Sequence, residues 1–87
     1  MKEITIHCAN VGSMAEIHEI LARELNFPGW YGKNLDALHD CLTAICEETR
    51  ITFLHFPSLP FPGNSLLRVL QDSERENSKL EISLVTN

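Results

Sequence analysis

Two aspartates, Asp36 and Asp40, are spaced so that they can act together on one ligand. They lie four residues apart in a segment with helical periodicity, and that spacing puts both carboxylates on one face, one turn apart. The only tryptophan and the only tyrosine of the chain, Trp30 and Tyr31, come just before this segment. Both residue types are enriched where proteins bind partners, because they offer a large area with few rotatable bonds. Aromatic area beside fixed negative charge therefore points to a surface that binds a basic partner.

Catalysis and metal binding fit the same residues less well. His39 and Asp40 are neighbours, and neighbours on a helix point about 100° apart, so they cannot form a dyad. Cys41 and Cys46 do not have the spacing of paired zinc ligands. No nucleophile-elbow, phosphate-loop or dinucleotide-binding motif is present. We expect no enzyme, no cofactor and no metal site, and a metal-dependent enzyme built on the two aspartates stays open as an alternative.

The composition is that of a small acidic globule. The chain has 87 residues, 44% of them hydrophobic and 22% charged, which predicts a single domain over residues 1–87. Twelve acidic against seven basic side chains give a net charge of −5. A nucleic-acid binder needs a basic face that displaces counterions from phosphates, so that class is excluded. A basic protein partner is compatible with this charge, although solubility alone explains the same balance.

The cysteines and the apolar runs indicate the compartment. Cys8, Cys41 and Cys46 are odd in number, whereas a secreted domain of this size normally carries an even disulfide framework. All three lie in apolar segments and are expected to be buried. The sequence shows no membrane-spanning run and no secretory leader. We expect a cytoplasmic protein, and nothing in the sequence requires more than a monomer.

Hydrophobic periodicity places these residues on alternating strands and helices. Ser13 and Glu16 have the spacing of a capping box, which predicts a helix that begins at Met14. The expected strands cover residues 3–8, 51–56 and 80–85, and the expected helices cover residues 14–25, 34–46 and 64–75. Strands joined through helices are usually parallel and share one sheet. The order β-α-α-β-α-β thus predicts an α/β fold with a small three-stranded parallel sheet packed with helices.

A helical wheel of residues 34–46 separates an apolar side from an acidic side. The apolar arc holds Leu35, Leu38, Cys41, Leu42, Ile45 and Cys46. The opposite side holds Asp36, Asp40, Thr43 and Glu47, with His39 on the border. Like charges one turn apart cost a helix about 0.2–0.5 kcal/mol, and Asp40 lies too deep for the helix dipole to compensate. A binding role explains this arrangement, and a solvated acidic face is the open alternative.

The loop before this helix contains two glycines that can bend it. Gly29 and Gly32 flank the two rings and are expected to take positive φ values, which glycine tolerates. We expect one ring to be packed and one to be exposed, with Tyr31 the better candidate for contact. Lys33 is expected to neutralise part of the charge of Asp36.

A second acidic cluster lies near the end of the last predicted helix. It consists of Asp72, Glu74 and Glu76, in a place where the helix dipole disfavours negative charge. Arg75 offsets only part of that charge. A binding role and simple solubility both explain this cluster.

The segment 31–42, YGKNLDALHDCL, closely resembles the signature of the barstar family of intracellular inhibitors of the ribonuclease barnase. The element order, the Phe27-Pro28 entry to the loop and an acidic residue late in the last helix also fit this family. The resemblance implies that the acidic helix and the preceding loop block the active site of a small basic ribonuclease, in a one-to-one complex without a cofactor. It implies a partner-binding site made of Trp30, Tyr31, Gly32, Asn34, Asp36, His39, Asp40, Thr43 and Asp72.

The resemblance also implies roles for the residues of this site. Asp40 occupies the place of a substrate phosphate among the basic groups of the nuclease, and Asp36 pairs with a basic side chain beside it. Trp30 packs against the nuclease while Tyr31 supports the loop. Asp72 stands where the family has a glutamate that contacts the enzyme.

Three residues depart from the family pattern. His39 replaces a tryptophan of the interface, Lys33 replaces a glutamate and Trp30 replaces a tyrosine. Because specificity is a difference between affinities, these changes are expected to alter the choice of partner. His39 is also expected to titrate near neutral pH, which makes the affinity weakly pH-dependent. We expect an inhibitor or immunity protein directed at a nuclease toxin encoded nearby, and an adaptor that binds a non-nuclease protein through the same helix is the alternative.

Overall fold

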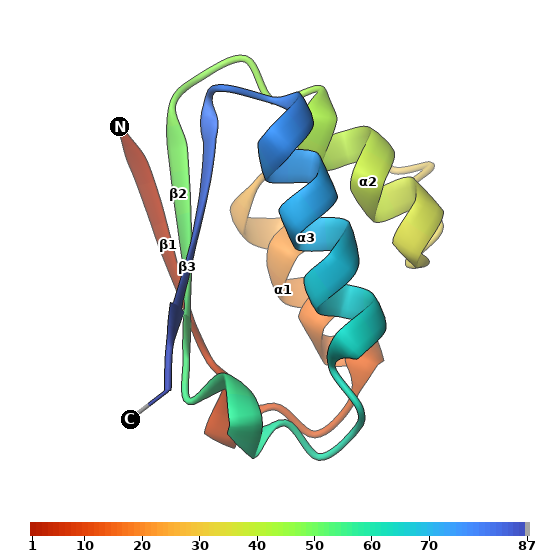
Figure 1. Ribbon diagram of the computed structural model, residues 1–87. Helices are drawn as coiled ribbons and strands as arrows, with labels where there is room; N and C mark the ends of the chain where they lie inside the picture. Colours follow the sequence, from red (N-terminus) through yellow and green to blue (C-terminus); the bar gives the residue numbers. More distant parts are fainter. Residues whose placement is uncertain (87) are drawn as a thin grey trace.

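A parallel sheet covered on one face by helices forms the body of the chain. The computed structural model describes residues 1–86, so residue 87 of the expected domain lies outside the described part. Within that part the sheet has three strands in the order β1-β2-β3, and the helices lie against one of its faces (Figure 1). The elements are β1 (Lys2–His7), α1 (Met14–Glu24), α2 (Leu35–Thr43), β2 (Thr49–Leu54), α3 (Asn64–Glu76) and β3 (Leu80–Val85). The predicted α/β fold and element order are confirmed.

The core lies between the helices and the sheet face that they cover. The strand register places Ile4, Ile51 and Ile82 in one row across the sheet. Leu21 of α1 and Leu38 of α2 are fully buried in the same core. Each such leucine contributes about 1.5–3 kcal/mol through burial, and this packing fixes the helices that carry the candidate site.

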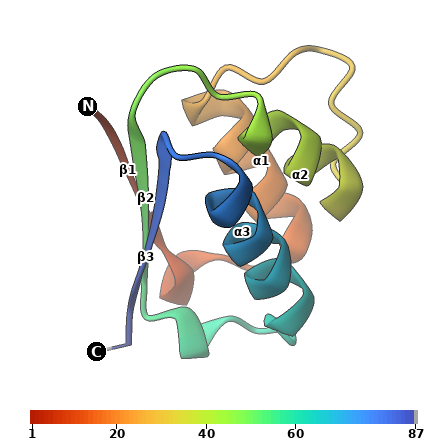
Figure 2. The ribbon, with the colours of Figure 1, turned by 45° about the horizontal axis from the view of Figure 1, so that its top comes forward.

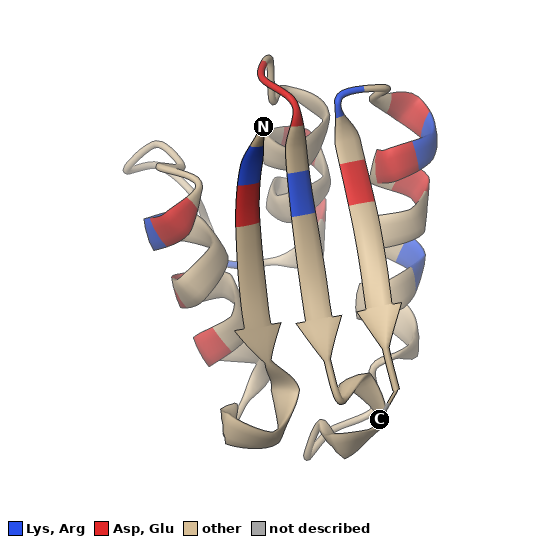
Figure 3. Cartoon of the chain, turned by 90° about the vertical axis from the view of Figure 1, so that its left-hand side faces the viewer, with Lys and Arg blue, Asp and Glu red and all other residues tan. Residues whose placement is uncertain are grey.

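The other face of the sheet carries no helix and is charged at one end (Figure 3). Register aligns Glu3, Arg50 and Glu81 on the three neighbouring strands. The Arg50 guanidinium lies 3.2 Å from the Glu3 carboxylate and 3.1 Å from the Glu81 carboxylate. The charges on this face are therefore largely paired with one another.

The first helix begins where the sequence predicted. Ser13 is its N-cap, and its hydroxyl oxygen accepts a hydrogen bond from the Glu16 backbone N–H at 3.3 Å. The Glu16 carboxylate in turn accepts the backbone N–H of Gly12 at 3.2 Å. The capping residues thus satisfy N–H groups that a helix start leaves unpaired.

The second helix ends three residues earlier than predicted, at Thr43 instead of residue 46. The Thr43 hydroxyl donates to the carbonyls of His39 and Asp40, at 2.8 and 3.2 Å. The N–H groups of Ala44 and Ile45 bond to carbonyls three residues back, at 3.3 and 3.4 Å, which is the tighter 3₁₀ pattern. The helix predicted beyond Thr43 is therefore wrong, although Ile45 still packs against the core and Glu47 is exposed.

The bounds of the second strand and the burial of Cys46 also differ from what the sequence predicted. The second strand was expected over residues 51–56 but covers Thr49–Leu54, because His55 turns the chain with a left-handed φ of 58°. Cys46 was expected to be buried on the helix, but it lies in the turn after α2 and is exposed. Cys8 and Cys41 are buried as expected.

Glu74 of α3 forms a hydrogen bond with the backbone of β3, which is an outer strand of the sheet. Its carboxylate accepts a hydrogen bond from the Ile82 backbone N–H of β3 at 2.7 Å. Of the acidic cluster predicted near the end of this helix, Glu74 therefore faces the sheet. Asp72 and Glu76 are left on the side that faces α2.

Candidate partner-binding site

The loop between α1 and α2 presents one aromatic ring and buries the other. Figure 2 shows this loop arching out from the end of α1 before it returns to the start of α2. Trp30 is 70% exposed, whereas Tyr31 is only 8% exposed. The Tyr31 hydroxyl lies 2.5 Å from Nδ1 of the buried His18, and the Phe27 ring packs against Tyr31 edge-on with centroids 4.9 Å apart. The preference for Tyr31 as the contact residue is wrong, because Tyr31 anchors the loop to α1 and Trp30 is the exposed ring.

The bend of this loop comes from residues other than its glycines. Asn26 and Lys33 take positive φ values of 55° and 54°, and no glycine of the described chain does so. Gly32 is needed for space, since a Cβ there would lie 2.9 Å from the Asn34 side-chain nitrogen. Asn34 caps α2 by accepting the Ala37 N–H on its side-chain oxygen at 2.8 Å. The start of α2 is thus fixed by its own cap.

The two aspartates of α2 lie exposed as the wheel predicted. The Asp40 side chain is 74% exposed, and its nearest cationic group is the His39 ring, at 4.0 Å. Asp36 forms no ion pair within residues 1–86. Lys33 was expected to neutralise Asp36, but its ammonium lies 3.3 Å from Glu19 on α1 instead. Both carboxylates therefore remain available to a partner.

Helix α3 adds carboxylates beside those of α2. Asn77, at the end of α3, donates from its side-chain amide to the carbonyls of Leu42 and Ile45, at 2.9 and 3.0 Å, which holds the two helix ends together. Asp72 is half-exposed and pairs with Arg75 on its own helix. Glu76 reaches across to His39, with 2.8 Å between the carboxylate oxygen and Nε2. We call the group Asp36, His39, Asp40, Asp72 and Glu76 the acidic surface.

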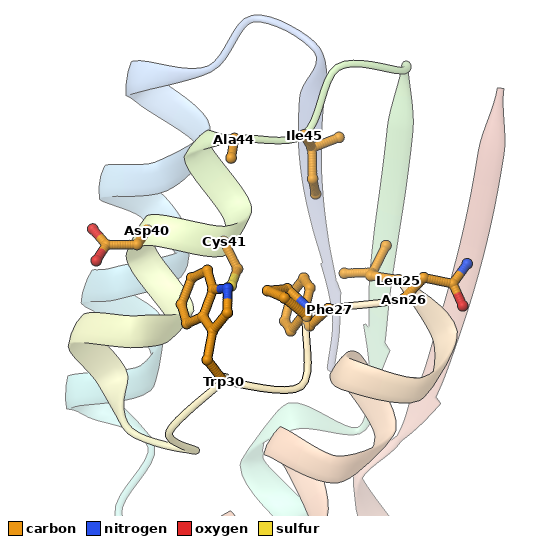
Figure 4. A pocket seen from close by; sticks show the side chains of 9 residues that line it. Leu25, Asn26, Phe27, Trp30, Asp40, Cys41, Ala44 and Ile45 are labelled. Carbon is orange, nitrogen blue, oxygen red and sulfur yellow. The ribbon is translucent and has the colours of Figure 1, made fainter.

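A hollow of about 260 Å³ lies between the loop and α2. In Figure 4 the Trp30 side chain rises from the loop toward Cys41, while the Asp40 carboxylate points outward from α2. The hollow is mainly apolar and is lined by Leu25, Asn26, Phe27, Pro28, Trp30, Asp40, Cys41, Ala44 and Ile45. Sequence reasoning missed this feature, because it placed Ala44 and Ile45 on a helix that in fact ends before them.

The pKa values of two histidines at the site, His39 and His18, are shifted in opposite directions. The hydrogen bond to Glu76 raises the pKa of His39 and outweighs the desolvation that lowers it, and the negative charges of Glu76, Asp40 and Asp72 also raise it. Burial lowers the pKa of His18, with the Lys33 charge as a smaller contribution. Burial, and to a lesser extent Cys41, raises the pKa of its partner Tyr31 to about 12. The shifts favour the neutral forms of His18 and Tyr31 in the anchor of the loop, whereas the shift of His39 favours its protonated form.

Comparison with known proteins identifies the family of this chain. The family model described as "Barstar (barnase inhibitor)" matches residues 1–86. The chain belongs to the barstar family. A relative from Bacillus subtilis (strain 168), named "Putative ribonuclease inhibitor YrdF", is 44% identical over 81 residues, which cover 87% of this chain and 89% of that protein.

The family description and the name of the relative support a coarse role for this chain. The family description names an inhibitor of a nuclease, so a ribonuclease-inhibitor-like role is supported for this chain. Among residues 1–86, no group of three or more His, Cys, Asp or Glu residues could hold a metal ion. No helix in the same part of the chain is long and apolar enough to cross a membrane.

The structure brings most of the predicted site residues of this barstar-family chain onto neighbouring elements. Trp30, Gly32 and Asn34 lie on the loop, and the remaining residues lie on two packed helices: Asp36, His39, Asp40, Thr43 and Asp72. Thr43 bonds to the backbone of its own helix, and Tyr31 lies beneath the loop. Glu76, which the predicted site omitted, joins the group through its bond to His39. Its place among carboxylates late in the last helix was the available signal.

Proposed function

We propose that this chain inhibits a small basic ribonuclease by covering its active site with the acidic surface and Trp30. The observation that carries this proposal is the exposure of Asp36 and Asp40 on one face of α2 without a strong internal counter-charge. A nuclease active site holds cationic groups that bind the phosphates of RNA. Exposed carboxylates at a fixed spacing are complementary to such groups, and opposite net charges speed the encounter.

Each part of the site has a role in this proposal. Asp40 stands in for a substrate phosphate, and Asp36 pairs with a basic side chain beside it. Trp30 covers apolar area next to them, and the hollow beside it accepts a side chain of the nuclease. Asp72 supplies a contact from α3. The loop is held before binding by its Tyr31 anchor and the Asn34 cap, so little conformational entropy is lost when the complex forms.

The proposal extends to the stoichiometry of the complex, its cellular compartment and the choice of nuclease. We propose a one-to-one complex without a cofactor, in the cytoplasm, in which the chain acts as an immunity protein against a nuclease toxin. Lys33, His39 and Trp30 differ from the family pattern on or beside the proposed interface. We propose that they direct the chain toward a nuclease whose surface differs from that of barnase.

Co-expression with a nuclease tests the proposed function. Cells that produce barnase, or a small basic nuclease encoded beside this chain, are expected to survive when the wild-type chain is present. The variant Asp40→Ala should fail to protect them while keeping the wild-type circular-dichroism spectrum. Glu24→Ala removes the same charge from an exposed site on α1 and serves as the matched control. Equal protection by both variants would contradict the proposed site.

A further inference from the structure

His39 sits in the middle of the acidic surface and joins its two helices. Its Nε2 lies 2.8 Å from the Glu76 carboxylate on α3, and its Nδ1 lies 4.0 Å from the Asp40 carboxylate on its own helix. The ring is therefore bracketed by carboxylates on both of its nitrogens. We call the bond between His39 and Glu76 the cross-helix clasp.

Negative groups dominate the surroundings of this ring on every element that packs near it. Asp40 faces it from α2, and Glu76 and Asp72 face it from α3. Of the two cations on α3, Arg75 is engaged by Asp72, and Arg68 does not shift the pKa of His39. The loop cation Lys33 is held by Glu19 on α1. In the free protein, the protonated ring is thus favoured by three carboxylates and opposed by no nearby free cation among the described residues.

A basic partner reverses this balance when it binds. Its cations approach the carboxylates that stabilise the charged ring, and a cation beside an imidazolium disfavours the protonated form. The carboxylate of Glu76 can then exchange its bond to His39 for a bond to the partner. We propose that the cross-helix clasp couples binding to proton release: the partner displaces the proton of His39 into solvent and takes over Glu76, so His39 is a positioning residue that makes the affinity rise with pH.

This inference rests on the proposed function and adds its regulation. The pKa of His39 is raised in the free chain and is lowered again by partner cations in the complex, so affinity falls as pH drops below the free-state pKa. The fall is at most about tenfold per pH unit for one proton. Above the free-state pKa, binding no longer depends on this group. An inhibitor built in this way holds its nuclease more weakly in acid.

The first experiment examines the clasp in the free chain. Nuclear magnetic resonance titration of the histidine ring signals should show His39 titrating above its ordinary pKa of 6.5, and Glu76→Gln should lower that pKa. His7, which is exposed on β1, is the internal reference and should not respond to Glu76→Gln. An unchanged His39 pKa in Glu76→Gln would overturn the clasp.

The second experiment examines proton release on binding, with barnase as the probe. Calorimetry near pH 6.5, in buffers of different ionisation enthalpy, counts the protons released by the wild type and by His39→Gln. Glutamine can still donate to Glu76 but does not titrate, so the wild type should release more protons than His39→Gln, by up to about one. His7→Gln is the matched control and should behave as the wild type.

The outcomes separate this inference from the proposed function. Tight binding with equal proton release by the wild type and His39→Gln would overturn the coupling and leave the inhibitor role standing. Absence of binding by both proteins would count against barnase as a target, and the coupling proposed for that complex would fail with it. The titration of the free chain would still decide whether the clasp exists.

Discussion

The uncovered face of the sheet and the acidic surface of the helices both carry several charges, but they arrange them differently. On the sheet, Arg50 lies between Glu3 and Glu81, within 3.2 Å of each. On the helices, Asp36 and Asp40 share a face that lacks any Lys or Arg bridge within residues 1–86. The opposite charges on the sheet partly cancel one another's field, so this face attracts a basic partner less strongly. Unpaired charge held at a fixed spacing, and not charge as such, marks the surface that we propose as the binding site.

The two rings of the loop make the same distinction on a smaller scale. Tyr31 satisfies its hydroxyl with His18 and packs against Phe27, so its interactions are complete within the chain. Trp30 leaves most of its area in water. The loop thus places a buried anchor, Tyr31, next to an exposed ring, Trp30.

The largest expected effect comes from removing the central carboxylate. Asp40→Ala should cost about 2–5 kcal/mol of binding free energy, because partner cations would be left buried without a counter-charge. Arg50→Ala on the sheet face should leave the affinity unchanged. Calorimetric titration with the nuclease measures both variants. Similar losses in the two would remove the distinction between the surfaces.

Loss of the exposed ring should have the next largest effect. Trp30→Ala is expected to cost about 2 kcal/mol of binding free energy, as for a central aromatic contact. Its free energy of unfolding should stay close to that of the wild type, because the side chain is mostly in water. Inhibition assays together with urea denaturation measure the two quantities. A Trp30→Ala variant that is unstable but fully inhibitory would assign the ring to the fold.

A change in the anchor residue Tyr31 should lower the stability of the fold more than the affinity for the nuclease. Tyr31→Phe leaves the buried Nδ1 of His18 without its partner, which should lower the free energy of unfolding by about 1–3 kcal/mol. The affinity of the folded fraction should change less than in Trp30→Ala. Denaturation curves at neutral pH provide the measurement. Wild-type stability combined with lost inhibition would instead place the hydroxyl in the interface.

The smallest expected effect is a pH dependence of stability in which the two histidines act in opposite senses. The pKa of His18 is lowered by burial, so its contribution is present above about pH 6.5 and is lost as pH falls toward its folded-state pKa. The pKa of His39 is raised, so its contribution is present below that pH and is lost as pH rises through its folded-state pKa. Urea denaturation between pH 5 and 8 should therefore show a steeper acid-side loss in His39→Gln than in the wild type. Identical profiles would contradict the raised pKa of His39.

The sequence predicted the elements well because local signals define them. The Ser13 cap, the alternation of the strands and the spacing of Asp36 and Asp40 each depend on residues within a turn or two of one another. The exposure of the two aspartates followed from helical geometry alone. These parts of the fold and site were correctly predicted.

Several of the errors around the site involve contacts between residues far apart in the chain. Tyr31 is buried because His18 lies thirteen residues earlier and offers a partner. Lys33, which has a left-handed backbone, pairs with Glu19 of α1 instead of Asp36. The clasp joins positions 39 and 76, and no local pattern signals it. Tertiary contacts of this kind decide which side of a short loop faces water.

The hydrogen bond between Glu74 and the backbone of β3 affects how readily the edge of the sheet can pair with another chain. Edge strands are templates for unwanted pairing, and natural proteins blunt them with charges or covers. Here a carboxylate occupies the outward N–H of Ile82 and places a negative charge beside it. An incoming strand would have to displace that bond and desolvate the charge before it could add to the sheet. We therefore expect Glu74 to hinder strand addition at this edge of β3, independently of any role in inhibition.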